Sequence, residues 1–183
     1  MTVIYVTQSC RYGRTMTPND LLIDALNRSR EACHGVLGGL TPEQANARPN
    51  DRANSITWLV WHIAREQDAQ IAPLCGTPQV WIAQHWQDRF DLDLPPGSMG
   101  YGHSSQDVAK VVVDDTALLT GYLDAATEAT REYIASLSDD RFDEVVDTRW
   151  DPPVTRGVRL VSIIDDAAQH AGQAAYVRGL LGF

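Results

Sequence analysis

The chain has 183 residues, a formal net charge of -9 at pH 7 and 44% hydrophobic residues. This length and composition are typical of one globular domain with a sizeable core. The acidic balance argues against binding to nucleic acid or to an anionic membrane, because neutralising phosphates requires clustered Lys and Arg. No apolar run approaches the roughly 20 residues that cross a bilayer, and the first residues lack the pattern of a signal peptide, so a cytoplasmic protein is expected.

The cysteines do not suggest a site of their own. Cys10, Cys33 and Cys75 are odd in number and far apart in the chain. They therefore predict neither a disulfide framework nor a Cys-x-x-Cys metal knuckle, and we interpret them as buried or incidental thiols.

The chain divides into an N-terminal extension, residues 1–15, and one domain, residues 16–183. The extension contains a short β-like run and matches nothing later in the sequence. Thr17-Pro18-Asn19-Asp20 has the signature of a helix start, with Thr as cap, Pro at the first helical position and an acid in the first turn. Apolar residues then recur in steps of four and three until Gly38-Gly39, which predicts a first bundle helix ending there.

A second helix is predicted from Asn54 or Ser55 to Cys75, after a short helical turn that starts at the capping-box pattern Thr41-Pro42-Glu43-Gln44. Apolar residues cover more than half of its circumference, as expected for a central helix. His62 and Glu66 share its inner face.

The segment from Thr77 to Ser105 is an irregular crossover in which Val80–Trp86 suggests one short helix. Loops of this length are uncommon inside a compact domain and are often functional. Aromatic and polar side chains that can line a pocket are supplied here by Trp86, Arg89, Tyr101 and His103. The alternative is a surface wrap that covers one end of the bundle.

Two further helices are predicted after the crossover. Ser105 caps a short helical stretch through Val113, and Asp114-Asp115-Thr116 begins the third main helix. Trp150–Gly157 is rich in turn residues and is predicted not to be helical, and the last helix follows from about Arg159 to Leu181. The predicted fold is all-α: a four-helix bundle with a long crossover between its second and third helices.

The last helix carries an acid and a histidine one turn apart. Apolar residues at Leu160, Ile163 and Ala167 begin a buried stripe on which His170 falls. Asp166 lies four residues before His170, so the carboxylate and the imidazole can converge. Taken alone, such a pair is more often a core histidine hydrogen-bonded to an acid.

His62 on the second helix turns the pair into a candidate metal site. His62, Asp166 and His170 would meet inside the bundle, and two imidazoles with one carboxylate suit a divalent transition metal. Zinc is the first choice, with nickel and iron as alternatives. Such a set leaves coordination positions open for water or substrate. Glu66 is either a fourth ligand or an acceptor that holds a ligand ring in place, and we prefer the second role.

The segments Trp58-Leu59-Val60-Trp61-His62-Ile63-Ala64-Arg65-Glu66 and Asp166-x-x-x-His170-Ala171-Gly172-Gln173 together resemble the DinB-like superfamily. The similarity is to its branch of mycothiol-dependent enzymes, which includes mycothiol S-transferases and is related to maleylpyruvate isomerase. It extends from about Thr17 onward. In that family a histidine of the second helix and a (His or acid)-x-x-x-His pair of the last helix bind a divalent metal. Asp166 stands where close relatives often have Glu or His, and the shorter acid bears on the identity of the metal.

The resemblance implies thiol transfer to a small electrophile, with mycothiol as the thiol co-substrate. Arg89, and Arg156 or Arg159 near the start of the last helix, would then be candidates for binding anionic groups. Two other classes stay open: a metal-activated water acting as hydrolase or isomerase, and a non-catalytic metal-binding bundle that binds a partner. A homodimer is compatible with all three classes.

Overall fold

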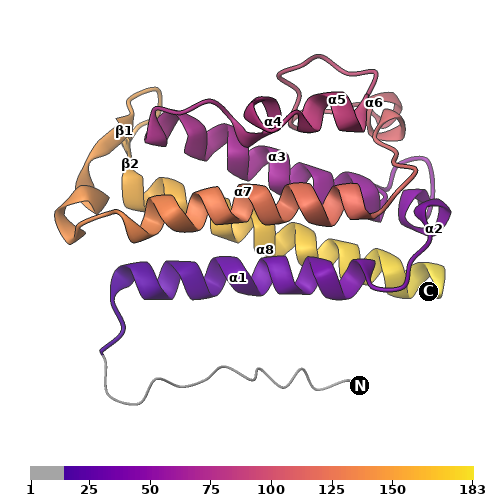
Figure 1. Cartoon of the computed structure of the whole chain (residues 1–183), viewed down its shortest axis with the longest axis horizontal. Helices are drawn as coiled ribbons and strands as arrows, with labels where there is room; N and C mark the ends of the chain where they lie inside the picture. Colours follow the sequence, from indigo (N-terminus) through magenta and orange to yellow (C-terminus); the bar gives the residue numbers. More distant parts are fainter. Residues whose placement is uncertain (1–14) are drawn as a thin grey trace.

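The computed structural model describes residues 15–183, so the extension with Cys10 lies almost entirely outside the described residues. Four long helices make up the bundle: α1 (Pro18–Leu37), α3 (Ile56–Cys75), α7 (Ala117–Ala135) and α8 (Arg156–Leu181). In Figure 1 they run side by side, with α1 and α3 each packed against both α7 and α8. The predicted all-α four-helix bundle is confirmed.

Short elements connect the long helices. They are α2 (Pro42–Asn46), α4 (Val80–Ala83), α5 (Trp86–Phe90), α6 (Ser105–Lys110), the 3-10 helix η1 (Asp139–Asp143), and strands β1 (Val145–Asp147) and β2 (Val154–Thr155). Figure 1 shows α4, α5 and α6 above α3, and the two strands at the opposite end of the bundle. No helix of residues 15–183 combines the length and the apolar character that a membrane crossing requires.

The helix starts predicted from the capping residues Thr17 and Thr41 are confirmed. The Thr17 hydroxyl accepts a hydrogen bond from the Asp20 amide at 3.2 Å, and the Asp20 carboxylate accepts one from the Thr17 amide at 2.9 Å. Thr41 forms the same reciprocal pair with Gln44 at the start of α2. Each pair satisfies amide groups that have no partner within the first turn, so these helices begin where the sequence indicates.

Three boundaries differ from the prediction. Ser104, not Ser105, caps α6, which ends at Lys110 instead of reaching Val113. The helix predicted over Val80–Trp86 is two helices, because His85 adopts a left-handed conformation with φ 58° between them.

The last helix also begins earlier than predicted. Thr155 caps α8 by accepting from the Val158 amide at 3.4 Å, so Arg156 and Gly157 are helical. The preceding turn-rich segment closes an antiparallel hairpin, in which Val145 pairs with Thr155, and the sequence analysis does not foresee this hairpin. Its strands are two and three residues long, too short to show an alternating pattern.

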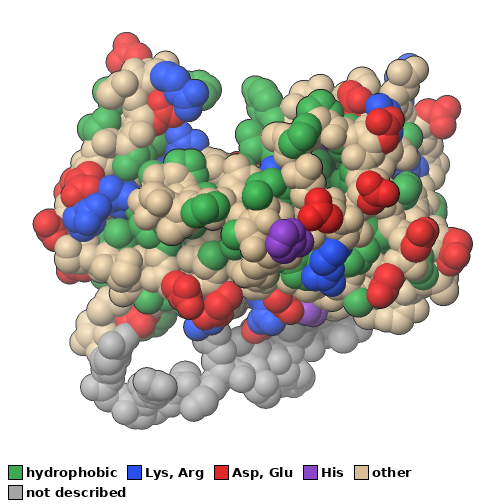
Figure 2. Space-filling view, turned by 45° about the horizontal axis from the view of Figure 1, so that its top comes forward, with side chains coloured by type: hydrophobic (Ala, Val, Ile, Leu, Met, Phe, Trp, Pro, Cys, Tyr) green, Lys and Arg blue, Asp and Glu red, His purple; other side chains and the backbone are tan. Residues whose placement is uncertain are grey.

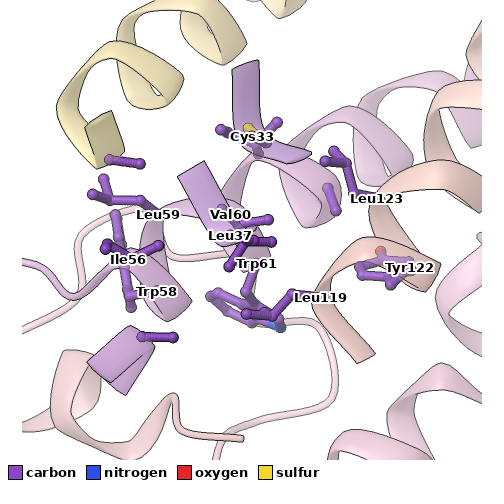
Figure 3. Close-up of a cluster of buried hydrophobic side chains, with 14 of the residues drawn as sticks. Cys33, Leu37, Ile56, Trp58, Leu59, Val60, Trp61, Leu119, Tyr122 and Leu123 are labelled. Atoms are coloured by element: carbon purple, nitrogen blue, oxygen red, sulfur yellow. The ribbon is translucent and has the colours of Figure 1, made fainter. Parts of the chain in front are cut away.

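The core surrounds α3. Thirteen consecutive residues, Ile56 to Asp68, are buried with the single exception of Glu66. Figure 3 shows side chains of α1, α3 and α7 pointing toward one another around Trp61 and Leu119, both 1% exposed. The stripe predicted on α8 is buried from Leu160 to Val177. The central position of the second helix, predicted from its apolar circumference, is therefore confirmed.

Candidate metal centre

Three potential ligands converge where α3 and α8 pack together. His62 comes from α3, Asp166 and His170 come from α8, and their ligand atoms all lie within 4.8 Å of one another. The distance from Nε2 of His62 to Oδ2 of Asp166 is 3.8 Å, and that from Nε2 of His170 to Oδ1 of Asp166 is 3.4 Å. Helical spacing sets the second distance, whereas the first depends on how the two helices pack.

One oxygen of this group has no hydrogen-bond partner among residues 15–183. Oδ2 of Asp166 is buried and accepts no hydrogen bond. A buried carboxylate oxygen without a donor is costly, and a cation between it and the two imidazoles would satisfy it. Two imidazoles and one carboxylate are also ligands that zinc, nickel and iron accept. The residues therefore fit a divalent ion.

A backbone carbonyl orients the ring of His62. Nδ1 of His62 lies in hydrogen-bond contact with the carbonyl oxygen of Met99, which can only accept, so Nδ1 carries the proton. The lone pair of Nε2 is then directed toward Asp166. Glu66, the acceptor expected from the sequence, instead accepts from the side chain of Gln70. Nδ1 of His170 is held in a similar way by Oε1 of Gln173 at 2.8 Å.

An indole ring packs against both imidazoles. Trp58 stacks on His62 with centroids 4.7 Å apart and planes 20° apart, and it meets His170 edge-on at 6.2 Å. Its Nε1 donates to Nδ1 of His103 at 3.1 Å. The two rings of the ligand set are thus packed on one side by an apolar surface, which keeps water away from that side.

The pKa values of the two imidazoles shift in opposite directions. Burial lowers the pKa of His62, which favours the neutral form that binds metals. Hydrogen bonding to Asp166 raises the pKa of His170, so protons compete with a metal chiefly at that ring. Burial and the nearby charge of Asp166 raise the pKa of Glu66 to about 8. A cation bound between these groups would oppose the last two shifts.

A cleft of about 820 Å³ opens beside the ligands. Its wall is formed by α3, α8, the hairpin and the end of the crossover, and it includes Asp166, Glu66, Tyr101, Trp150, Arg149 and Arg159. Figure 2 shows a hollow at its upper edge, between the end of the molecule that carries the hairpin and the body that carries the crossover. Asp166, the ligand candidate in this wall, therefore faces a space large enough for a small molecule.

Two of the five predicted substrate-binding residues line the cleft, and three do not. Tyr101, 90% exposed, and Arg159 line the cleft. His103 does not line the cleft, and both of its ring nitrogens are hydrogen-bonded, Nδ1 to Trp58 and Nε2 to Ser98.

The structure does not bring the other two predicted residues, Trp86 and Arg89, to the cleft. Trp86 is 6% exposed and packs in the core against Tyr122 with centroids 5.7 Å apart. The guanidinium of Arg89 lies over the Trp86 ring, 3.8 Å from its centroid. Both therefore serve the packing of the crossover, because a large aromatic ring gains more from burial against α7 than from exposure in a cleft.

Several residues of the site are missed in the sequence analysis. Asp147 accepts from Arg149 at 2.8 Å and from Arg159 at 2.9 Å, and these bonds hold its pKa well below the usual range and fix both guanidinium groups beside the cleft. Asp147 and Arg149 belong to the unforeseen hairpin. The other missed residue is Gly100, whose φ is 101° and on which a Cβ would lie 2.5 Å from Nδ1 of His62. The run of glycines between residues 97 and 102 is the signal that could have indicated a close backbone approach.

A family model described as mycothiol-S-transferase matches residues 21–182. The chain belongs to this family. The mycothiol S-transferase family is DinB-like, which agrees with the resemblance and with the fold. A solved structure titled "Crystal structure of the conserved protein of locus from Enterococcus faecalis" is 42% identical in sequence, with a TM-score of 0.86 over 91% of this chain and 98% of that chain. No curated protein matches.

We expect this family member to bind about one divalent ion per chain and His62→Ala to abolish tight binding. The loss should exceed the roughly 10- to 100-fold that follows removal of an outer hydrogen-bond partner, because a ligand atom itself is lost. Metal content after dialysis of untagged protein measures this. His85→Ala is the control, since His85 is exposed and paired with Asp88. Equal metal content in both variants would contradict the site.

Metal binding should raise the melting temperature, and the increase should shrink in acid as protons compete for the imidazoles. At a free-ion concentration of 100 times Kd the expected stabilisation is about 2.7 kcal/mol.

The metal-free protein has a pH dependence of its own. The raised pKa of His170 stabilises the metal-free fold fully below pH 6.5, the ordinary pKa of histidine, and this contribution is lost as the pH rises through the pKa of His170 in the folded state. The lowered pKa of His62 has the opposite effect, because the unfolded chain takes up that proton more readily.

The difference between metal-loaded and chelator-treated melting curves, measured from pH 8 to pH 5, isolates the contribution of the metal. A difference that is zero at pH 7, or constant over this range, would exclude binding by these imidazoles.

Gly100→Ala should weaken metal binding about 10-fold or more, because the added methyl group displaces either the ring of His62 or the Met99 carbonyl. Gly102→Ala is a matched control: its φ is 72°, so it carries a similar backbone strain of about 1–3 kcal/mol, but a Cβ there meets nothing within 4 Å. Metal titration of both variants tests this, and the same affinity in both would refute the role of Gly100.

Proposed function

We propose that the protein is a divalent-metal-dependent thiol S-transferase that conjugates a low-molecular-weight thiol, with mycothiol as the first choice, to a small electrophile. The observation that carries the proposal is that Asp166 belongs both to the ligand group and to the wall of the 820 Å³ cleft. A bound ion would therefore be reachable from the cleft. The family adds the thiol, since its members are mycothiol-related, metal-dependent enzymes.

His62, Asp166 and His170 would hold the ion, with zinc preferred and nickel or iron as alternatives. A divalent ion in this position supplies a positive charge that lowers the pKa of a thiol bound to it, so that the thiolate is available near neutral pH. The protein's own part is to present two neutral imidazoles, through Met99 and Gln173 as acceptors, and to exclude water on the side of Trp58.

The cleft wall would bind the thiol and the electrophile. Arg159 and Arg149 are fixed by Asp147, which orders two cations in a chain that is acidic overall. Arg159 also donates to Gln70 at 2.5 Å, so its position is set from α3 as well. The exposed ring of Tyr101 offers a flat apolar surface at the same opening. These groups suit a polar small molecule that carries anionic or carbonyl groups.

The described cysteines of the chain are not candidates for the nucleophile. Cys33 is fully buried, and burial raises its pKa to about 12. Burial also raises the pKa of Cys75, which lies at the end of α3 and is not among the residues that line the cleft. A protonated thiol away from the cleft cannot attack a bound electrophile, which excludes these two cysteines as the nucleophile and is consistent with a thiol co-substrate.

The test is an incubation of metal-loaded enzyme with a chromogenic electrophile and, in separate reactions, mycothiol, bacillithiol, glutathione or cysteine. We expect conjugation that requires both the metal and the thiol, that is fastest with mycothiol, and that falls at least about 100-fold in His62→Ala while His85→Ala keeps it. Turnover at the same rate without any thiol would overturn the proposal in favour of a metal-activated water, that is, a hydrolase or isomerase. Metal binding without turnover of any electrophile would favour a non-catalytic bundle.

A further inference from the structure

Arg65 is a buried cation that the proposed chemistry does not use. It lies on α3 three residues after His62, on the same side of the helix, and it is 0% exposed. Its guanidinium packs over the ring of Trp81, 4.7 Å from the centroid, and has no contact with the cleft. A buried guanidinium is costly unless its donors are satisfied, and Nη2 of Arg65 has no hydrogen-bond partner among the described residues. A hydrophobic side chain of similar size would fill this space at lower cost.

The hydrogen bonds of Arg65 hold the two ends of the crossover. Nη1 donates to Oε1 of Gln79 at 2.9 Å, at the start of the crossover, and to the hydroxyl of Tyr122 at 3.1 Å. Nε donates to the carbonyl oxygen of Ser98 at 3.0 Å, at its far end. A bond to a carbonyl from a charged donor is stronger than one between neutral groups, so Arg65 fixes the peptide that follows Ser98.

The peptide that follows Ser98 precedes the peptide whose carbonyl, that of Met99, orients the ring of His62. The carbonyl of Met99, one residue after Ser98, accepts from Nδ1 of His62. From the other side, Oγ of Ser98 lies 2.7 Å from Nε2 of His103. The segment 98–103 is therefore tied to α3 at both ends, by Arg65 at its start and by Trp58, through His103, at its end.

We propose that Arg65 is a positioning residue for the metal ligand His62, acting through the Ser98 and Met99 carbonyls. Arg65 holds the carbonyl of Met99 where it accepts the Nδ1 proton, and this selects the tautomer of His62 whose Nε2 lone pair faces Asp166. Without Arg65 the segment can shift, and the ring of His62 loses both its orientation and its tautomer preference. Replacing Arg65 should therefore lower the metal affinity about 10- to 100-fold, as is typical when a group that orients a ligating histidine is removed.

The inference rests on the proposed metal centre. It also differs from a general role in stability, because Asp68, the buried ion-pair partner of Arg65, has hydrogen bonds of its own to the crossover. The carboxylate of Asp68 accepts from the amides of Val80 and Trp81 and from the hydroxyl of Tyr122, each at 2.8 Å, whereas its distance to Arg65 is 3.7 Å. The start of the crossover therefore keeps two hydrogen bonds to α3 when Arg65 is replaced, while loss of the buried ion pair lowers the stability of the fold.

The test compares Arg65→Met with Arg178→Met. Arg178 is a matched control because it also ties a helix to backbone carbonyls of another segment, those of Gly35, Val36 and Gly38, and is not one of the residues around the ligands. Metal affinity is measured by competition with a chromophoric chelator, and the geometry of the site is read from the visible absorption of the cobalt(II)-loaded protein. We expect Arg65→Met to lose 10- to 100-fold in affinity and to shift the cobalt spectrum, and Arg178→Met to lose stability alone.

Two further variants keep the test decisive if Arg65→Met does not fold. Arg65→Lys retains the charge, but all three donors of its ammonium group lie on one nitrogen and do not reproduce the separate Nε and Nη1 positions from which Arg65 bonds Ser98 and Gln79. Tyr122→Phe removes the hydroxyl that accepts from Arg65 and donates to Asp68, and it leaves the bond of Arg65 to Ser98 intact. We expect weaker metal binding in Arg65→Lys than in Tyr122→Phe. Equal affinity in these two, or in the two Arg→Met variants, would overturn the inference.

A readout in the metal-free protein separates this inference from the proposed function. The nitrogen-15 chemical shifts of His62 report its tautomer, and we expect the Nδ1-protonated form in the wild type and a mixture of tautomers in Arg65→Met. If the wild type bound no metal, the proposed function would be wrong while the tautomer shifts still decided the role of Arg65. An unchanged tautomer in Arg65→Met would overturn that role even in a protein that binds metal.

Discussion

The buried polar side chains of α3 impose the constraint on which the rest of the structure depends. Arg65 and Asp68 are 0% and 4% exposed, and a buried charged group needs partners because water is not available to it. Most of those partners come from the crossover, namely the amides of Val80 and Trp81 and the carbonyl of Ser98. The crossover is therefore held as a fixed layer over α3, and its last residues lie beside the ligands.

The candidate metal centre combines a local part with a tertiary part. The helix alone places Asp166 and His170 on one side of α8, four residues apart. His62 joins them only because α3 packs against α8, and its ring is turned toward them by the Met99 carbonyl. The buried Oδ2 of Asp166 then faces an imidazole nitrogen without a proton between them, which is an arrangement that a cation stabilises.

The cleft adds connecting segments to the two helices that carry the candidate ligands. The ligands come from two long, well-packed helices, which keep their positions precise. Arg149 and Trp150 come from the hairpin connection and Tyr101 from the crossover, so several of the groups that would contact a substrate lie on connecting segments, whereas Arg159 lies on α8. If the proposed metal binds there, a helical scaffold would hold the ion while the connecting segments contribute to the wall of the cleft, so the wall could vary without a change in the ligands.

The sequence alone determined the bundle and the ligand candidates. Periodicity identified the four long helices and their buried faces, the capping boxes at Thr17 and Thr41 located two starts, and the spacing of Asp166 and His170 followed from helical geometry. These features depend on residues within a few positions of one another. The resemblance of the segments around His62 and His170 to a known family supplied the expected fold and the thiol.

Only the tertiary structure decided which polar residues reach the site. Trp86 lies in the core because α7 offers an apolar surface there, and Asp147 reaches the cleft because a short hairpin turns back toward α8. The acceptor for His62 is a backbone carbonyl, which every residue possesses, so no side chain in the sequence could mark Met99 for this role. Hydrogen bonds of this kind follow from the path of the main chain through space, and that path is set by packing between segments far apart in the sequence.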